Sequence, residues 1–594
     1  MGVFKTGLVL LALSVSGVAS SQEIMSLQEV KKGMQGVGRT VFKGTEIEEF
    51  QVEILGVLEN TGPRQNLIIA RLSGGPMEQT GVIMGMSGSP VYIGDKVIGA
   101  VSTAFPFAKE AIAGITPIQE MISTTTGAGA GPSFSGASSM PLEFKKMMTL
   151  EELASPLRRE ASSSPGGVSY IQTPLSFSGL SQGAVNRLTS LFSGSNLVPV
   201  AGGSGGGKFE QAIEKSLEPF KPGSAVSVQL VRGDFDLSAV GTVTMVDNGR
   251  VYAFGHPFLN MGSIQWPMAR AEVISLLPNL YASFKISSTA DVVGTVEQDR
   301  ATAIAGTLGK HPQMIPINVE LETSMGAKEK YRFEIVTDKF LSPILTYITM
   351  LSTITSRERQ YGDSTLRMVA TINLGAGTSI TVGDIFTGGT SADDLASLVA
   401  TPVYLLLNNP YRHVSVNSVE IVVRSDEKPK TARLERVELD RSTYQPGGTV
   451  KMKVHLRGEL DDAIVEETEL ELPRSLKTGD LLFYVGEGGM LDAMDAAELR
   501  EAYYPQTYPQ LIRALNNLRK NNRVYVRLSE RRSGIVLRGE DLSDLPPSAA
   551  AIIGSRSNTS EMRRIYYSPA LDAELPTSYT VSGYRLIQLK IRSS

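Results

Sequence analysis

A glycine-rich turn that runs directly into two apolar strands is the feature that most limits how this chain can fold. The turn reads Gly85-Met86-Ser87-Gly88-Ser89-Pro90, and the apolar run that follows, from Val91 to Val101, is interrupted by Gly94-Asp95. A Gly-Asp pair between two apolar runs is typical of a tight β-hairpin. Glycine adopts backbone angles that other residues avoid, so the turn can present one serine. The pattern predicts a β-rich unit with Ser87 held on a sharp turn.

Ser87 is a candidate nucleophile. The amides of Gly85 and Ser87 can point into one small hole and stabilise an oxyanion while the Ser87 hydroxyl attacks a carbonyl. Trypsin-like serine proteases place their nucleophile in such a context, and the segment Ala113–Ile118 resembles the strand that closes their second barrel. The lipase-type elbow Gly-x-Ser-x-Gly does not fit, because Ser89 stands at its last glycine position. A turn without chemistry is the structural alternative.

Composition removes several classes of function. The 594 residues exceed one domain, and 57 basic against 61 acidic residues, with no basic block, give no support for nucleic-acid binding. The absence of cysteine excludes a cysteine nucleophile, disulfides and thiolate zinc sites. None of the four histidines is spaced for a helical zinc pair, so a metal site is not expected. Serine chemistry of the predicted kind requires no cofactor.

The N-terminus has the pattern of an export signal. Lys5 precedes an apolar run from Thr6 to Ala19, and small residues follow at Ser20-Ser21. We therefore expect residues 1–21 to be a cleaved signal peptide and the protein to be periplasmic or extracellular; an uncleaved anchor is the alternative. The most apolar later segment, Ile335–Leu351, carries Asp338 and Lys339, so no internal membrane span is expected.

Composition shifts divide the chain into further regions. Alternating apolar residues predict strands over 24–121 and again over 216–427, and a Gly/Ser/Thr-rich linker over 122–166. Residues 167–215 form a small insert, with a helix over 182–192 and a flexible glycine run over 202–207. Strict alternation predicts an immunoglobulin-like β-sandwich over 428–475, and an α+β region follows over 476–594. The chain is thus predicted to be mainly β.

A serine nucleophile needs a base within hydrogen-bond reach, and His256 has the best context for that role. It follows the predicted strand Val251–Phe254 directly, beside Gly255 and before Pro257, so its backbone is rigid. The structural alternative is a histidine that caps the strand. The remaining histidines lie in turns, in a loop or on the predicted sandwich: His311, His413 and His455.

Two blocks of sequence resemble the SpoIVB serine peptidase family, of the stage IV sporulation protein B type. The first runs from Glu49–Ile54 through Gln79–Pro90 to Val97–Val101, and the second from Gly241–Thr244 through Gly255-His256 to Gly294 and Ala303–Gly306. In that family the histidine block precedes the serine block, so the order here is permuted. The resemblance implies a trypsin-like double β-barrel with Ser87 as nucleophile and His256 as general base.

The acid of the predicted triad departs from the family pattern. The family's acid position falls at Leu72-Ser73, where this chain has no carboxylate. Asp299, in the second block, is the first substitute and Asp291 the second. A turn residue paired with Arg300 is the structural alternative for Asp299. A dyad without an acid, or an inactive site, also fits the sequence.

These patterns predict an exported serine endopeptidase that cleaves polypeptides through an acyl-enzyme. A catalytically inactive envelope scaffold or protein-binding module is the alternative, with the C-terminal modules contacting protein or envelope partners. A third alternative is self-cleavage within the 122–166 linker.

Overall fold

The computed structural model describes residues 22–126, 144–157, 167–204, 220–356, 364–459, 462–499, 505–537, 540–542, 546, 548–549, 552 and 562–592. The predicted signal peptide, most of the 122–166 linker and part of the glycine run lie outside these residues. Within the described parts of the chain, no helix is both long and apolar enough to cross a bilayer.

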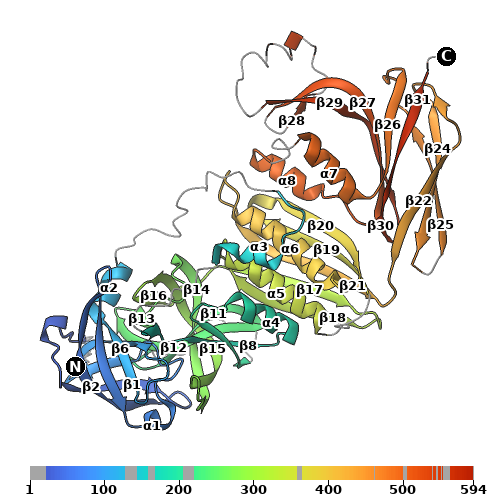
Figure 1. Cartoon of the computed structure of the whole chain (residues 1–594). Helices are drawn as coiled ribbons and strands as arrows, with labels where there is room; N and C mark the ends of the chain where they lie inside the picture. The colour runs from blue at the N-terminus through green and yellow to red at the C-terminus, as the bar shows by residue number, and fades with distance from the viewer. Residues whose placement is uncertain are drawn as a thin grey trace, which may run out of the picture.

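The N-terminal strands close into a six-stranded barrel (Figure 1). Its order is β4-β1-β2-β3-β6-β5, and pairing of β4 with β5 completes the ring. The strands are β1 (Gln35–Val41), β2 (Ile47–Gly62), β3 (Gln65–Ser73), β4 (Pro90–Ile93), β5 (Lys96–Ala104) and β6 (Ile112–Pro117). A short helix, α1 (Met77–Thr80), leads into the serine turn, and α2 (Ile118–Thr126) follows the barrel. Ring closure leaves few free edges, which suits strands this apolar.

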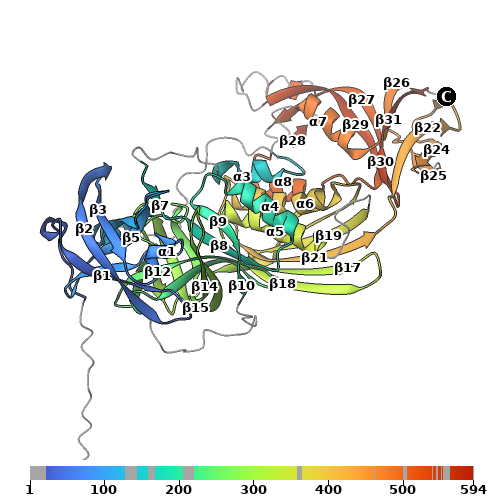
Figure 2. The ribbon, with the colours of Figure 1, turned by 60° about the horizontal axis from the view of Figure 1, so that its bottom comes forward.

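A second ring of six strands follows in the chain. Its order is β11-β14-β15-β16-β13-β12, closed by pairing of β11 with β12. The strands are β11 (Ala225–Gly233), β12 (Asp236–Asp247), β13 (Arg250–Ala253), β14 (Gly262–Leu277), β15 (Phe284–Arg300) and β16 (Ala303–Leu308). The two barrels lie side by side (Figures 1 and 2). The predicted mainly β chain with a trypsin-like pair of barrels is therefore confirmed.

The segment between the barrels attaches to both of them. The strand β7 (Ser169–Tyr170) pairs with β5, whereas β8 (Thr173–Ser178) pairs with β12 and carries β9 (Leu197–Ala201). A two-residue strand, β10 (Gly203–Ser204), pairs with β15. The predicted helix of this region is present as α4 (Gln182–Leu191). Residues 167–204 therefore extend the barrels rather than forming a separate insert.

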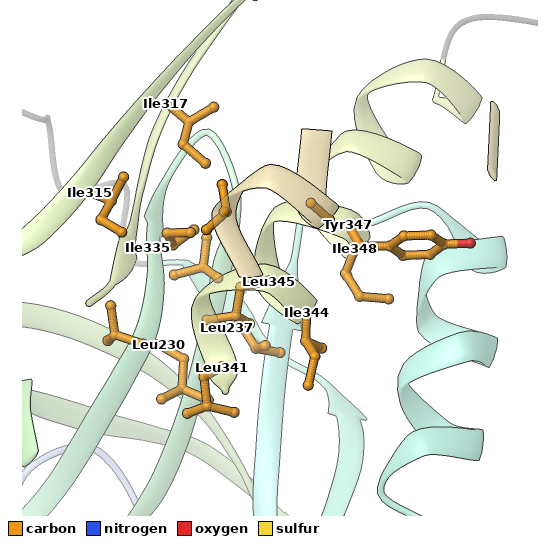
Figure 3. Packing of buried hydrophobic residues seen from close by; sticks show 14 of the residues in the cluster. Leu230, Leu237, Ile315, Ile317, Ile335, Leu341, Ile344, Leu345, Tyr347 and Ile348 are labelled. Carbon is orange, nitrogen blue, oxygen red and sulfur yellow. The ribbon is translucent and has the colours of Figure 1, made fainter. Parts of the chain in front are cut away.

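A helix-covered layer continues the second sheet beyond β11; its strands lie within the range 216–427 that was predicted to form strands, whereas its helices α5 (Leu341–Thr355) and α6 (Ser391–Leu407) were not predicted. It contains β17 (Met314–Glu322), β18 (Lys328–Val336), β19 (Thr365–Leu374), β20 (Ser379–Thr387) and β21 (Val416–Asp426). Helices α3 (Leu150–Ala154), α5 and α6 cover it (Figure 1). Figure 3 shows Leu341, Ile344 and Leu345 of α5 packed with Leu230 and Leu237 of the barrel. The layer and the second barrel thus share one core.

The C-terminal part is a sandwich of two sheets. One sheet has the order β25-β24-β22-β30, and the other contains β23-β31-β26-β27-β28 with β29 beside β27. Their bounds are β22 (Thr431–Leu439), β23 (Thr443–Tyr444), β24 (Thr449–Gly458), β25 (Ala463–Glu471), β26 (Gly479–Gly486), β27 (Arg523–Leu537), β28 (Glu540–Leu542), β29 (Met562–Pro576), β30 (Thr580–Ser582) and β31 (Tyr584–Ile591), with helices α7 (Gly488–Leu499) and α8 (Tyr508–Asn516) between them. One hydrophobic core joins both sheets. The sandwich therefore extends past 475 to the last strand, and its immunoglobulin-like character stays a prediction.

Candidate active site between the two barrels

The serine turn, residues 85–89, is a tight loop between α1 and β4. Gly85 and Gly88 have φ values of 91° and 93°, which favour glycine. The amide and hydroxyl of Ser89 both donate to the Met86 carbonyl, at 3.0 and 2.6 Å. These bonds fold the turn back on itself and leave Ser87 at its apex. The sequence prediction of a sharp turn is confirmed.

Three hydrogen bonds hold the serine turn against β12 of the second barrel. The Thr242 amide donates to the Ser87 carbonyl at 2.9 Å, and the Thr242 hydroxyl donates to the Gly85 carbonyl at 3.2 Å. The Thr244 hydroxyl donates to the Gly88 carbonyl at 2.7 Å. A Cβ on Gly88 would lie 2.0 Å from the Thr242 carbonyl oxygen. We call this contact between the serine turn and β12 the barrel seam.

The histidine enters the same seam from the end of β13. Phe254 and Gly255 have positive φ values of 72° and 69°, which turn the chain sharply before His256. The Gly255 carbonyl accepts the Thr116 hydroxyl of β6 at 2.7 Å. A Cβ on Gly255 would lie 3.2 Å from the Cβ atoms of Ala100 and Ser102 in β5. The histidine loop of the second barrel is therefore anchored on the first barrel.

The His256 imidazole is fully buried and has the protonation expected of a base. Burial lowers its pKa to about 4, so the ring is neutral at pH 7. Its Nδ1 lies 2.8 Å from the Pro257 carbonyl oxygen, which can only accept, so Nδ1 carries the proton and Nε2 keeps a lone pair. Among the described residues neither Nε2 nor the fully buried Ser87 Oγ has a hydrogen-bond partner. The seam thus contains both groups, without a hydrogen bond between them.

Asp299 supports the histidine loop rather than the imidazole. Its buried carboxylate accepts the amides of Phe258 at 2.8 Å, Leu259 at 2.8 Å and Met261 at 3.0 Å. Burial raises the Asp299 pKa, and these amide bonds oppose that rise. The acceptor at Nδ1 of His256, where a triad acid would stand, is the Pro257 carbonyl. The second substitute, Asp291, is exposed on the same strand.

The predicted oxyanion amides of Gly85 and Ser87 are buried. The Met84 carbonyl points toward β15, where it accepts the Lys285 amide at 3.2 Å. Because the C=O and N–H of a trans peptide point in opposite directions, the Gly85 N–H points away from β15. Within the described part of the chain, the amides of Gly85 and Ser87 donate to no protein acceptor. The assignment of these two amides to an oxyanion hole stays a prediction.

Lys285 is a buried group beside the turn that sequence reasoning missed. Its ammonium donates to the Thr40 hydroxyl at 2.8 Å, and burial lowers its pKa to about 7. Its aliphatic chain would contact a Cβ on Gly85 at 3.4 Å. The sequence offers no signal for it, since Phe284-Lys285-Ile286 has the alternation of an ordinary half-exposed strand. Among the described residues, no three or more His, Cys, Asp or Glu side chains form a group that could hold a metal ion.

Comparison with known proteins gives one finding. The family model for the SpoIVB peptidase S55 matches residues 2–122, which include the serine turn and end before His256. Nothing matches among the curated proteins, and nothing matches among the solved structures. The resemblance drawn from the serine block is thereby confirmed: residues 2–122 of this chain match the SpoIVB peptidase S55 family.

Proposed function

We propose that this chain is an exported serine endopeptidase that cleaves polypeptides through an acyl-enzyme. One observation carries the proposal: Ser87 Oγ and a neutral His256 with a free Nε2 lie buried at the barrel seam, without other hydrogen-bond partners among the described residues. Groups this polar are normally paired when they are buried. The match of residues 2–122, which bear Ser87, to the SpoIVB peptidase S55 family supports the same function. Export rests on the pattern of residues 1–21.

In the proposed reaction, Ser87 Oγ attacks the peptide carbonyl while its proton passes to Nε2 of His256. The amides of Gly85 and Ser87 stabilise the oxyanion that forms. The C–N bond then breaks, and Nε2 returns the proton to the leaving amine. In the second step, water attacks the acyl carbonyl while its proton passes to Nε2 of His256. The bond between the acyl group and Ser87 Oγ then breaks, and Oγ takes the proton back. Throughout, Nδ1–H stays on the Pro257 carbonyl, and Asp299 acts as a positioning residue that holds the loop after His256.

A fluorophosphonate probe tests the nucleophile directly. We expect the mature chain to be labelled at Ser87, as located by mass spectrometry, and His256→Ala to lose the label. Ser190→Ala, which removes an exposed serine hydroxyl of α4, is the control and should be labelled as the parent is. Labelling at Ser87 that survives in His256→Ala would remove the histidine from the proposed role.

A protein-binding scaffold is the second candidate. It is favoured by the absence of a hydrogen bond between Ser87 and His256 and by the lack of a carboxylate at Nδ1. In this case the C-terminal sandwich would contact protein or envelope partners. A folded protein that is never labelled, even in the variants of residues 170 and 171 described below, would favour this candidate.

A further inference from the structure

One edge of β5 is left unpaired by β4 beyond Ala100, beside the serine turn. β4 pairs with β5 only from Lys96 to Ala100, while β6 covers the other side of β5 to Ala104. Beyond Ala100, the free edge is taken by β7 (Figure 2): Tyr170 pairs with Thr103 and Ser169 with Ala104. The Ile171 amide donates to the Ser102 carbonyl at 2.9 Å, which extends the ladder. We call residues 169–171 the strap.

The strap runs in the direction that a substrate would need. The pairing is antiparallel, so the strap passes from Ala104 toward Ser102 as its own numbering rises. The next residue of β5, Val101, binds the serine turn: its carbonyl accepts the Gly88 amide at 2.8 Å and its amide donates to the Ser89 carbonyl at 3.0 Å. The carboxyl end of the strap is thus directed toward Ser87. An acyl group attacked by Ser87 must arrive with the same polarity.

Two side chains of the strap contact the site. The Tyr170 ring lies with its centroid 5.5 Å from that of His256, at an interplanar angle of 31°. Ile171 is 3% exposed and packs in the core of the first barrel, in the same cluster as Met86 and Val101. The strap therefore fills two places, one against the imidazole and one beside the serine turn. With the strap seated, Ser87 and His256 are both 0% exposed.

We propose that the β5 edge from Ser102 to Ala104 is the strand site for substrate, and that the strap occupies it as an internal pseudosubstrate. The inference rests on the proposed function. Extended peptides commonly bind by adding a strand to an open sheet edge, with pockets for particular side chains. The substrate class is an extended polypeptide with an aromatic residue against His256, followed by an aliphatic residue whose carbonyl Ser87 attacks. The resting chain is latent until the strap leaves.

A binding experiment tests the strand site without catalysis. All proteins are full-length and carry Ser87→Ala, and the probe is a fluorescent hexapeptide with the sequence of residues 167–172, Gly-Val-Ser-Tyr-Ile-Gln. We expect the strap variant Tyr170→Ala/Ile171→Ser to bind this probe at least about tenfold more tightly. Each 1.4 kcal/mol by which the substitutions destabilise the strap-occupied state raises the population of the open state about tenfold. A scrambled hexapeptide should not bind. Equal binding with and without the strap substitutions, or no binding to the strap variant, overturns the proposal.

Folding of the variants is checked by circular dichroism and melting. Tyr170→Ala alone, which removes only the half-buried ring, replaces the double variant if that variant does not fold. The matched control is Tyr567→Ala, an exposed tyrosine of β29, which should leave probe binding as in the parent.

Fluorophosphonate labelling with Ser87 intact separates the two proposals. Labelling that is about tenfold faster in the strap variant supports latency, by the same population argument. Labelling at Ser87 that is equally fast with the strap intact overturns the pseudosubstrate and leaves the proposed function standing. Absence of labelling in a strap variant that binds the hexapeptide supports the strand site and rejects the peptidase chemistry.

Discussion

At the scale of single residues, Gly88 has the shortest distance between an added Cβ and a neighbouring atom among the described glycines. Its φ of 93° disfavours any side chain, and a Cβ would meet the Thr242 carbonyl oxygen at 2.0 Å and the Phe254 amide nitrogen at 2.5 Å. Both obstacles are backbone atoms, so the barrels would have to move apart. We expect Gly88→Ala to lower the free energy of unfolding by more than about 3 kcal/mol.

Gly94→Ala is the matched control for that substitution, measured by urea unfolding. Gly94 also has a positive φ, of 60°, but its Cβ would meet no atom within 4 Å. Gly94→Ala should lower the free energy of unfolding by only about 1–2 kcal/mol, because only the strain of a positive φ opposes the alanine. Similar losses for the two variants would show that the seam is less tightly packed than described.

Lys285 makes stability depend on pH above neutrality. Its pKa is about 7 in the folded chain but near 10.4 in an unfolded one. Between these values the unfolded chain binds a proton that the folded chain does not, so the stability contributed by this group rises with pH. Lys285→Met removes the buried charge. We expect it to raise the melting temperature most near about pH 6 and least near about pH 10, and a difference that is constant with pH would contradict this account.

Asp299 is predicted to matter for stability as well as for the site. In Asp299→Asn, one of the two oxygens that accept the loop amides becomes a donor and faces N–H groups. We expect a loss of about 1–3 kcal/mol in the free energy of unfolding, the cost of buried unpaired polar groups. Asp291→Asn, on the exposed side of the same strand, should be neutral in the same measurement. A larger loss of stability in Asp291→Asn than in Asp299→Asn would show that contacts other than those of Asp299 hold the loop after His256.

Residue-level patterns in the sequence predicted the serine turn well and its surroundings poorly. The turn is local: its glycines and Ser89 are consecutive, and their bonds lie within it. The hydrogen-bond partners of Asp299 lie in the loop after His256, 38–41 residues earlier in the chain, and no spacing rule predicts that this loop folds against Asp299. Catalytic roles for Ser87, His256 and Asp299 stay predictions.

At the scale of elements, strands with alternating burial were predictable and the helical layer was not. Every residue of α5 from Leu341 to Ile354 is buried, and the helix contains no charged residue, so no exposed charged face marks it in the sequence. In β24, alternation of buried and exposed residues made the strand evident. The periodicity of apolar and polar residues identifies a helix or strand when one of its faces is exposed to solvent.

The sandwich offers a test at this scale. Core residues of β22 and β24 pack with those of β26, β27 and β31, and β30 pairs directly with β22. We therefore expect a fragment of residues 428–475 to remain unfolded, whereas residues 428–594 fold with a cooperative melting transition seen by circular dichroism. A cooperative transition in the shorter fragment would restore the boundary at 475.

At the scale of the whole molecule, we expect the barrel seam to make the two barrels unfold as one unit. The Thr244 hydroxyl, which donates to the Gly88 carbonyl, crosses 156 residues of chain. Thr244→Val keeps the shape but leaves that carbonyl without the bond, at a cost of about 1–3 kcal/mol. Thr244→Ser keeps the hydroxyl and is the control. Both barrels should lose the same stability by hydrogen exchange; a loss confined to one barrel would show that they unfold separately.

The distance along the chain between Gly88 and Thr244 has a consequence for descent. Mutations at the two positions arise independently, yet a Cβ at position 88 would lie 2.0 Å from the Thr242 carbonyl oxygen, and the Gly88 carbonyl accepts the hydroxyl at position 244. Among relatives of this protein, residues on the outer faces of the barrels can diverge freely. The glycine should be kept whatever side chain stands at position 242, because its obstacles are backbone atoms, and a hydroxyl residue should be kept at position 244.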